Sequence, residues 1–335
     1  MDNQINILVA NNHLAKTGGT ENYTLALAIA LLKAGYTVEY FTFEKGLISD
    51  KLEEMGISFM SKKKYDLILA NHYTTVDALY KKGFIIQTCH GIFPSLEQPS
   101  KRADLHVAIS EEVRIYLKSK GYKASVIYNG VDCDRFKSIN PINDTIKSVL
   151  SLCQGQEASA LVEKICKSKN YKYLQANKFT DNIYSIESLI NQSDIVIGIG
   201  RSLYDAMACG RPVISYDSRS YSEAIGDGYI NETNIINSLK CNCSGRSLKI
   251  RFNEESLSSE FDKYNPSDGN YLRDFALKNL NVDLNTEKYL SLFKKGNNFK
   301  NKLRKVIFII LSSEFYHCIR HPRHLLWRIK NMRAQ

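Results

Sequence analysis

Residues 194–213, with the sequence DIVIGIGRSLYDAMACGRPV, contain the pattern that decides the fold. The stretch begins with an apolar run, passes through Gly198 and Gly200 into a helical segment, and ends with a proline before the next apolar run. This order predicts a buried strand, a tight turn, a short helix and a second strand. Units of this kind build a Rossmann-like layered sheet.

The same alternation runs through both halves of the chain and predicts an α/β fold. In the first half, continuous apolar runs predict parallel strands buried on both faces, and helical patterns lie between them. The expected strands are residues 5–9, 38–43, 67–70, 84–88, 105–109 and 126–128, and the expected helices 21–33, 48–55 and 111–119. In the second half, the expected strands are 149–152, 173–174, 194–199 and 212–215, and the expected helices 157–167, 186–191, 202–208, 257–263, 271–279 and 286–294. Between the halves, Gly130, Pro141 and three asparagines within 129–144 predict a linker, hence two Rossmann-like domains facing a cleft.

Charge and composition limit the class of protein. The 335 residues suffice for two domains, and no stretch approaches the roughly 20 apolar residues that cross a bilayer. The amino terminus lacks the pattern of a secretory signal. The eight cysteines are scattered, as in a cytosolic protein with reduced thiols, and Cys241 and Cys243 have no second pair nearby to complete a zinc site. Of the net charge of +10, residues 299–335 carry nine Lys and Arg and one acid, so the body is nearly neutral and the tail is polybasic.

The turn after the predicted strand 194–199 has the residues of an anion site. Gly198 and Gly200 allow a phosphate to approach the helix end, and Ser202 lies at the helix amino terminus, where backbone amides are unpaired. The guanidinium of Arg201 can bind phosphate with two hydrogen bonds. The Asp205 carboxylate, about one turn further on, can accept from ribose hydroxyls. The turn therefore predicts a nucleotide diphosphate site, and the alternative is tight packing of a helix on a strand through small residues.

A second glycine turn follows the first predicted strand. Gly18 and Gly19 lie directly before the helix 21–33, at a carboxyl strand end, where ligands bind in such sheets. The turn is not a Walker loop, because Lys16 precedes the glycines. Either the glycines contact a bound anion, or the turn is an ordinary one closed by a Thr20 cap.

These motifs resemble those of retaining glycosyltransferases with the GT-B fold, of the GT4-like kind. Residues 198–213 are similar to the carboxyl-terminal donor motif, which commonly reads E-G-F-G-x-x-x-x-E-A-M-A-C-G-x-P-V. Residues 18–21 (GGTE) resemble the family's glycine loop, and residues 103–110 (ADLHVAIS) one of its strands. Residues 128–132 (YNGVD) resemble its interdomain segment. The resemblance spans residues 4–295 with the motifs in the family's order.

The resemblance implies two domains, an acceptor-side domain over residues 1–140 and a domain that binds the nucleotide sugar over residues 141–298. The charge pattern adds a third part, a basic amphipathic tail over residues 299–335. The donor is a substrate, and neither a cofactor nor a metal is expected. The Asp132-Cys133-Asp134 stretch looks like a metal-binding D-x-D motif, but it belongs to the interdomain segment.

Two positions depart from the family's donor motif. Asp205 takes the place of the glutamate that holds the ribose, and the amides of Ser202 and Leu203 would face the diphosphate. Ile197 replaces the acid that meets the donor sugar, which leaves the donor sugar open. The family's basic pair after the first strand of the second domain is absent, and Arg201 is the candidate to replace it, since a leaving diphosphate needs cationic stabilisation.

Three histidines at predicted strand ends are candidates for the cleft. His90 resembles the family's cleft histidine, which approaches the transferred sugar, and the alternative is a turn histidine bonded to backbone. His13 and His72 are candidates for the acceptor side. In a retaining transfer, the acceptor hydroxyl attacks from the leaving-group face and the phosphate accepts its proton.

The tail mixes cations with apolar residues, which suits a helix lying in the interface of an anionic membrane. It can instead pack on the body, and nucleic acid is not an expected partner, because no nucleic-acid motif accompanies the charge. We therefore expect a cytoplasmic enzyme, peripheral on the inner face of the cell membrane, that transfers sugar to a glycan or lipid-linked acceptor in cell-surface polysaccharide synthesis. The alternative is a GT-B pseudoenzyme that binds glycan or protein partners without turnover; a GT-B epimerase would need cleft carboxylates that the sequence does not place.

Overall fold

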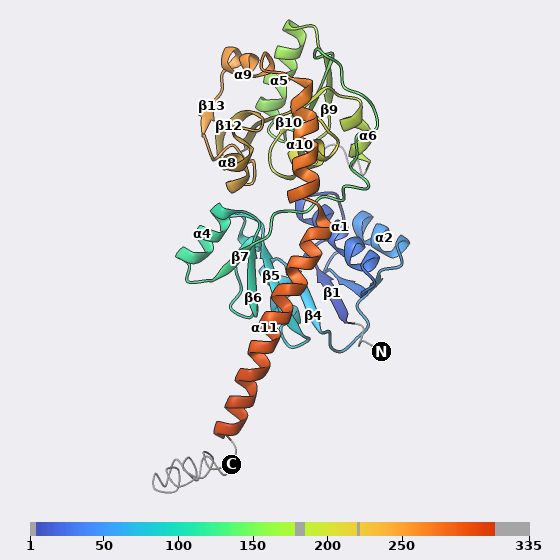
Figure 1. Ribbon diagram of the computed structural model, residues 1–335, viewed down its shortest axis with the longest axis vertical. Coiled ribbons are helices and arrows are strands. Elements are labelled where there is room, and N and C mark those ends of the chain that lie inside the picture. Colours follow the sequence, from blue (N-terminus) through green and yellow to red (C-terminus); the bar gives the residue numbers. More distant parts are fainter. Residues whose placement is uncertain (1–4, 178–184, 220–221, 312–335) are drawn as a thin grey trace. The chain divides into compact units, whose positions relative to one another are not determined.

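The computed structural model describes residues 5–177, 185–219 and 222–311. The chain divides into two compact units at Tyr289, so both sheets lie in the first unit and residues 290 onward form the second. Each unit is described by itself. The first contains two sheet-centred lobes, shown as ribbons in Figure 1.

The amino-terminal lobe has a seven-stranded sheet in the order β3-β2-β1-β4-β5-β6-β7, parallel at every pairing. Five of its strands lie where the sequence predicts them, the last, β7, lies two residues before the predicted 126–128, and the two-residue β3 is additional. They are β1 (Asn6–Ala10), β2 (Thr37–Phe41), β3 (Ser58–Phe59), β4 (Leu67–Asn71), β5 (Phe84–Cys89), β6 (Leu105–Ala108) and β7 (Ala124–Val126). The order reverses beside β1, so β1 and β4 form a switch point at whose carboxyl ends ligands bind in such sheets.

Four helices pack on this sheet, three of which the sequence predicts. These are α1 (Gly19–Lys33), α2 (Leu47–Glu54), α3 (Tyr73–Leu79) and α4 (Glu111–Ser119), with the 3-10 turn η1 (Ser95–Glu97) after β5. The Ser110 hydroxyl caps α4 by accepting from the Val113 amide at 3.3 Å, as expected from the sequence. Helix α3, not predicted, starts one residue beyond β4 and is only seven residues long.

The carboxyl-terminal lobe has a six-stranded sheet in the order β13-β12-β11-β10-β8-β9. The strands are β8 (Ser148–Ser151), β9 (Lys172–Gln175), β10 (Ile195–Gly198), β11 (Val213–Arg219), β12 (Ser222–Ile230) and β13 (Ile250–Arg251). The four predicted strands pair in parallel, as expected. The strands β12 and β13, which were not predicted, are antiparallel, so this sheet is mixed.

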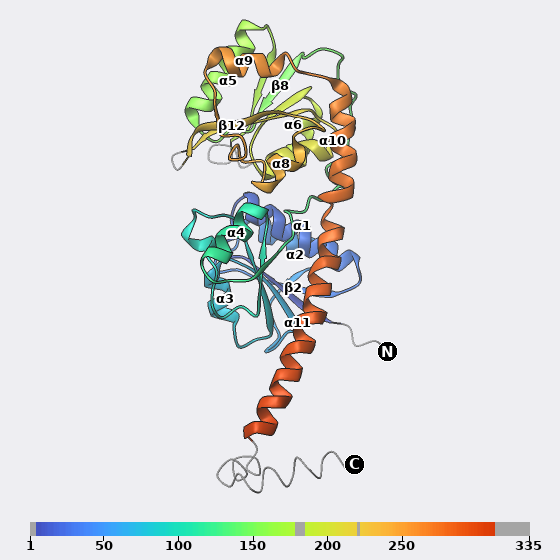
Figure 2. The ribbon, with the colours of Figure 1, turned by 60° about the vertical axis from the view of Figure 1, so that its left-hand side comes forward.

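Helices cover both faces of the second sheet, because successive strand residues point to opposite faces. On one face, Val149, Ile195 and Ile214 pack against α5 (Gln156–Ser168) and α9 (Glu254–Phe261). On the other, Leu150 and Val196 pack against the remaining helices. These are α6 (Ile186–Asn191), α7 (Arg201–Ala208), α8 (Ile235–Lys240) and α10 (Pro266–Asn279). Figure 2 shows α5 and α9 on the side of the sheet opposite α6, α8 and α10.

The predicted linker packs against the start of α11 (Val282–Leu311). A bridge joins Val131 to Asn281, and the Asn285 side chain donates to the Tyr128 carbonyl at 2.8 Å. Gly130 is required here, because a Cβ would lie 2.7 Å from the Val282 Cα. No helix among the residues described has the length and apolarity to cross a bilayer. Of the predicted basic tail 299–335, residues 312–335 lie outside the described residues.

Candidate functional site

A cavity of about 770 Å³ lies between the two sheets of the first unit, and we call it the central cavity. Its lining comes from the segments after β1, β4, β5, β6 and β7 in one lobe, and in the other from the segments after β8, β9 and β10, the end of β11, and Asn242, Ser244 and Arg246. The carboxyl ends of parallel strands therefore face it, as the switch-point rule predicts. Of the predicted site residues, His13, Gly18, Gly19, His72, His90, Gly200, Arg201, Ser202 and Asp205 line the cavity.

Arg201 is a buried cation at the amino terminus of α7. Its side chain is 7 % exposed, and its Nε lies 3.4 Å from Oδ1 of Asp205, one helical turn on. Neither Nε nor Nη1 has a hydrogen-bond partner in the part of the chain that the structure describes. Buried polar groups are almost always hydrogen-bonded, so this guanidinium is arranged for a ligand that supplies acceptors. Asp205 balances part of the charge, although burial raises the pKa of its carboxyl.

The turn before α7 is shaped by glycine. Gly200 is the N-cap, has φ of +64° and leaves the helix end without a side-chain cap. Its amide donates to the Cys243 carbonyl at 3.0 Å, which ties the turn to the loop after α8. A left-handed φ of this kind favours glycine. Since the turn provides no side-chain cap, the Ser202 amide at the start of the helix is available to a ligand.

Two residues of the predicted donor site do not line the cavity. Leu203 is fully buried in the core, and its amide donates to the Gly200 carbonyl at 3.0 Å. The expectation that this amide faces a diphosphate is therefore wrong, because the first turn of the helix uses it. Gly198 ends β10 beneath the turn, where a Cβ would lie 2.8 Å from the Ser202 hydroxyl, so its role is close packing. Ile197, the predicted departure from the donor motif, is buried in the core.

The glycine turn before α1 is occupied by a carboxylate. Gly18 is the N-cap of α1 and makes no side-chain cap, so the alternative Thr20 cap is not formed. The Glu21 carboxylate folds back over Gly18, where a Cβ would lie 2.2 Å from Oε2. Oε1 of Glu21 pairs with His13 Nε2 at 2.8 Å, which helps to lower the pKa of this buried glutamate against desolvation. A phosphate at Gly18 would face this carboxylate, so the cavity is more favourable to an anion near Arg201.

His90 is a neutral, buried member of the lining. Desolvation, with the charges of His72 and Arg201, lowers the pKa of His90 to about 3. Its Nε2 lies 2.7 Å from Oδ1 of Asn71, whose Nδ2 donates to the Thr24 hydroxyl at 2.8 Å. Because that hydroxyl gives its one proton to the Thr20 carbonyl, Asn71 presents its oxygen to His90 and Nε2 carries the imidazole proton. His90 therefore acts in the cavity as a neutral hydrogen-bonding group.

His90 is held from behind by a pair of tyrosines. The ring of Tyr23 meets the His90 ring edge-on, with centroids 5.3 Å apart. The Tyr23 hydroxyl donates to the Tyr289 hydroxyl at 2.9 Å, and Thr88 lies 2.7 Å from the same oxygen. His90 thereby receives support from α1, β5 and the start of α11.

His72 lies at the end of β4 with a φ of +70° and is the N-cap of α3. Its Nδ1 accepts from the Asn12 amide at 3.3 Å, and its ring stacks on His13 at a centroid distance of 5.9 Å. Burial lowers the pKa of His72 to about 4.

The two neutral histidines predict acid sensitivity. The unfolded chain binds protons at His72 and His90 near pH 6.5, whereas the folded chain does so only near pH 4 and 3. The stability from neutral burial is thus complete above pH 6.5 and is lost as the pH falls toward 3. We expect the free energy of unfolding to fall by up to about 1.4 kcal/mol per pH unit for each histidine. Urea denaturation at several pH values from 7 to 4 measures this, and His90→Gln should flatten the curve; an unchanged slope would contradict the assignment.

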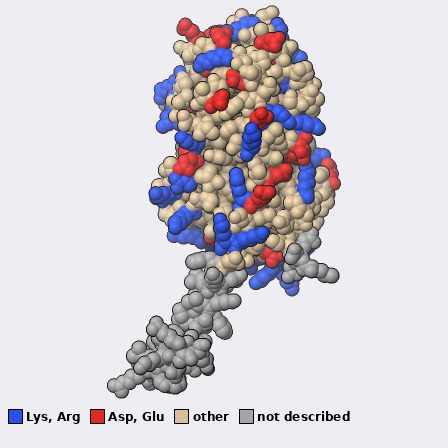
Figure 3. All heavy atoms as spheres, in the orientation of Figure 1, with Lys and Arg blue, Asp and Glu red and all other residues tan. Residues whose placement is uncertain are grey.

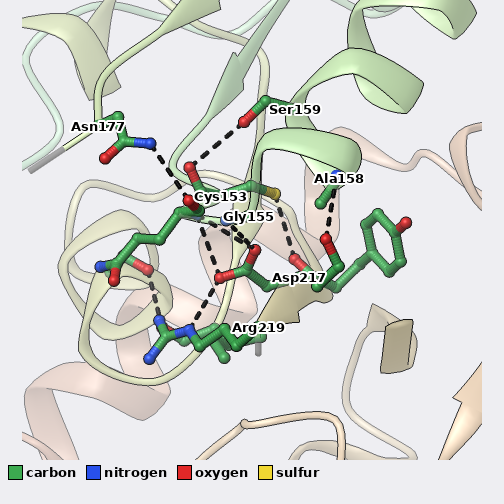
Figure 4. A network of polar contacts seen from close by, with 12 residues as sticks. Cys153, Gly155, Ala158, Ser159, Asn177, Asp217 and Arg219 are labelled. Atoms are coloured by element: carbon green, nitrogen blue, oxygen red, sulfur yellow. Dashed lines mark hydrogen bonds and ion pairs between the residues drawn. The ribbon is translucent and has the colours of Figure 1, made fainter. Parts of the chain in front are cut away.

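A polar network that no sequence pattern indicates lies after β8, where the family's basic pair is absent and Gln154 and Gly155 stand instead. Figure 4 shows Asp217 of β11 beneath this loop. Its carboxylate accepts from the Gln154 amide at 3.2 Å, from the Gly155 amide at 2.9 Å and from Arg219 Nε at 3.0 Å. Asp217 thus binds the two amides just before α5, where the helix dipole favours a carboxylate, and it holds Arg219, which lines the cavity.

Two further lining residues were also missed. Arg246, in the loop after α8, donates from Nε and Nη2 to Glu112 of α4 at 2.7 and 2.6 Å, joining the two lobes. Phe93 is 49 % exposed and lies with its ring 5.6 Å from the Arg246 guanidinium. Neither residue stands in a recognisable motif, so only the tertiary structure identifies them.

Metal-binding patterns in the sequence do not converge on the cavity. The described residues contain no group of three His, Cys, Asp or Glu side chains placed to hold a metal ion. Asp132 accepts from the amides of Asp134 and Arg135, each at 3.1 Å, and Asp134 pairs with Lys33 at 2.8 Å. The D-x-D stretch thus organises its own turn, away from the cavity lining.

Comparisons with known proteins agree with this architecture. Residues 56–135 match Glycosyltransferase Family 4. No curated protein matches the chain. Among solved structures, Anabaena HepE in complex with UDP and glucose superimposes with a TM-score of 0.60 at 14 % identity, covering 87 % of this chain and all of its own.

Two further structures are similar in fold. The pneumococcal O-GlcNAc transferase GtfA, in complex with UDP and GlcNAc, has a TM-score of 0.56 at 8 % identity, covering 88 % of this chain and 99 % of its own. The catalytic domain of starch synthase IV from Arabidopsis thaliana, bound to ADP and acarbose, has a TM-score of 0.52 at 11 % identity with the same coverages. The predicted GT-B fold is thereby confirmed, and together with the family match it indicates a transferase.

Proposed function

We propose that this protein transfers a sugar from a nucleotide-sugar donor to a glycan acceptor, with the diphosphate bound at Arg201. The observation that carries the proposal is the buried guanidinium at an uncapped helix terminus, with two nitrogens that lack hydrogen-bond partners among the described residues. The dipole of α7 and the Arg201 guanidinium together stabilise the negative charge of a leaving diphosphate. The nucleotides in the HepE, GtfA and starch synthase complexes support a donor of this class.

We assign the other residues of the cavity by their chemistry. Asp205, beside Arg201, is assigned to accept from a ribose hydroxyl, and the Ser202 amide to donate to a phosphate oxygen. Neutral His90 hydrogen-bonds the transferred sugar, and His13 and His72 lie toward the acceptor. We propose that the anomeric configuration is retained, with the acceptor proton passing to the leaving phosphate.

The acceptor and the setting are proposed from the tail. The polybasic, partly apolar residues 299–335 suit an anionic membrane surface, each cation near the surface contributing about 1 kcal/mol. An enzyme bound to the cytoplasmic side of the membrane would meet lipid-linked glycans there. We therefore propose that the acceptor is a lipid-linked glycan of a cell-surface polysaccharide pathway.

Nucleotide binding tests the donor proposal. We expect UDP, GDP or ADP at millimolar concentration to raise the melting temperature of the protein, because a ligand at 100 times its Kd stabilises the native state by about 2.7 kcal/mol. The matching sugar nucleotide should then be hydrolysed slowly or transferred. The alternative function, a pseudoenzyme, is motivated by buried Ile197 and by the absent basic pair. A melting temperature unchanged by every nucleotide, together with no donor hydrolysis, would favour that alternative.

A further inference from the structure

The loops that precede β4, β5, β6 and β7 collect positive charge. Segments 60–66, 80–83, 98–104 and 118–123 hold ten of the 45 Lys and Arg of the chain and only two acids. Their net charge equals that of residues 299–335, so the remainder of the chain is net negative. We call these cations the basic edge: Lys62, Lys63, Lys64, Lys81, Lys82, Lys101, Arg102, Lys118, Lys120 and Lys123.

The topology brings the four loops together. Strands β4 to β7 are consecutive neighbours in one parallel sheet, so their amino ends lie at the same edge. With neighbouring strands about 4.8 Å apart, the strand ends span only roughly 15 Å. The central cavity lies at the opposite, carboxyl edge. In Figure 3, Lys and Arg side chains gather along the lower margin of the described body.

The charge of the basic edge is mostly unneutralised. Seven of its lysines are exposed and make no ion pair with any residue that the structure describes: Lys63, Lys64, Lys81, Lys101, Lys118, Lys120 and Lys123. The two acids bind backbone, since Asp66 accepts from the Asn6 amide and Asp104 from the Ile85 amide, each at 2.9 Å. A concentrated, exposed field of one sign marks a surface for an extended anionic partner.

The chemistry of the basic edge selects the kind of partner. Nine of its ten cations are lysines, which act as mobile point charges, whereas specific recognition of phosphates or bases favours the planar fork of arginine. Tyr80, 41 % exposed, lies among them, with Arg102 at 4.6 Å and Lys81 at 5.3 Å from its ring centroid. An aromatic ring with a polar tip, surrounded by lysines, suits the interface of a bilayer.

We propose that the basic edge docks the amino-terminal lobe on an anionic lipid bilayer. The inference extends the membrane association proposed above, but it rests on a different surface from the tail and does not depend on the enzymatic reaction. Each lysine near an anionic leaflet contributes about 1 kcal/mol, and the attraction weakens within a Debye length of about 10 Å at 0.1 M salt. The seven exposed lysines therefore suffice for salt-sensitive binding.

Vesicle sedimentation of the full chain tests the surface. The variant Lys64→Glu/Lys101→Glu/Lys123→Glu reverses one charge in each of three loops. Its matched control, Lys172→Glu/Lys240→Glu/Lys278→Glu, makes the same change in net charge on exposed lysines of the other lobe. A third variant, Arg320→Glu/Arg323→Glu/Arg328→Glu, measures the tail separately. Vesicles contain about one third phosphatidylglycerol in roughly 0.1 M salt, and neutral phosphatidylcholine vesicles give the baseline.

We expect the basic-edge variant to lose at least about tenfold in partition to anionic vesicles and the control less than about threefold. Equal losses in the two variants, or unchanged binding by the basic-edge variant, would overturn the proposal. So would preferential binding of single-stranded RNA over vesicles that is lost in the same variant, since that result identifies a nucleic acid as the partner. Replacing Lys64, Lys101 and Lys123 with glutamine repeats the test by removing the three positive charges without adding negative ones. An absent nucleotide response in the parent protein would refute the transferase proposal and leave the vesicle result standing.

Discussion

Replacing Arg201 with alanine is expected to lower kcat by about 100- to 1000-fold, the usual loss when one preorganised donor to a developing charge is removed. Arg201 is the first residue of α7, a helix without a side-chain cap, and it also lines the central cavity. The other two arginines of the cavity lining are held in closer ion pairs, Arg219 with Asp217 at 3.0 Å and Arg246 with Glu112 at 2.6 Å, whereas Arg201 lies 3.4 Å from Asp205. The measurement is steady-state turnover of the sugar nucleotide that stabilises the protein most.

A control must separate the loss of kcat from a loss of folding stability, because Arg201→Ala leaves the Asp205 carboxylate buried without its partner. Breaking a buried pair in this way costs about 3–5 kcal/mol. The double variant Arg201→Ala/Asp205→Asn removes the orphaned charge and should recover melting temperature without recovering kcat. Arg201→Lys keeps the charge but loses the two-pronged geometry, so its kcat should fall between those of the parent and Arg201→Ala. Unchanged kcat and KM in Arg201→Ala would remove Arg201 from the mechanism.

The parts of the fold that follow from local pattern were predictable. β1 and β10 are apolar runs ending in polar or glycine turns, and their positions follow from the sequence alone. β12 escaped prediction because its sequence, SEAIGDGYI, contains two glycines and two acids and has the composition of a loop. It is a strand because β11 offers it an antiparallel partner along most of its length, which is a tertiary effect.

The candidate site also contains contacts that follow from local sequence and contacts that depend on the tertiary fold. Arg201 and Asp205 are four residues apart on one helix, so their proximity was implied by helical spacing. The pairing of His13 with Glu21 joins a loop to a helix, and nothing in the spacing specifies it. The neutral state of His90 depends on burial, which a sequence motif does not report.

Asp217 and Arg246 needed the whole fold to be recognised. The strand order places β8 and β11 on either side of β10, so the loop after β8 and the end of β11 meet only in three dimensions. The Arg246–Glu112 pair joins residues 134 positions apart. Such contacts are set by topology, and a single sequence without structure gives no signal for them.

Asp217→Ala is expected to lower the free energy of unfolding by at least about 3 kcal/mol. The carboxylate is fully buried and accepts from the amides of Gln154 and Gly155 and from Arg219. Removing it strands two amides and a guanidinium, each of which carries a desolvation cost of about 1–3 kcal/mol if left unpaired. The midpoint of urea denaturation measures the loss.

Asp262→Ala provides the matched control in the same lobe. Asp262 also pairs with a cation, Lys169 at 2.6 Å, but its side chain is 64 % exposed, so its removal should cost less than about 1 kcal/mol. Asp217→Asn removes the negative charge but keeps the size of the side chain. The asparagine oxygen can still accept from the amides of the loop after β8, whereas Arg219 loses its counter-charge. Because Arg219 lines the cavity and is held by Asp217, we expect Asp217→Asn to change the affinity for nucleotide more than the free energy of unfolding. Equal destabilisation by Asp217→Ala and Asp262→Ala would mean that the loop after β8 holds its conformation without this carboxylate.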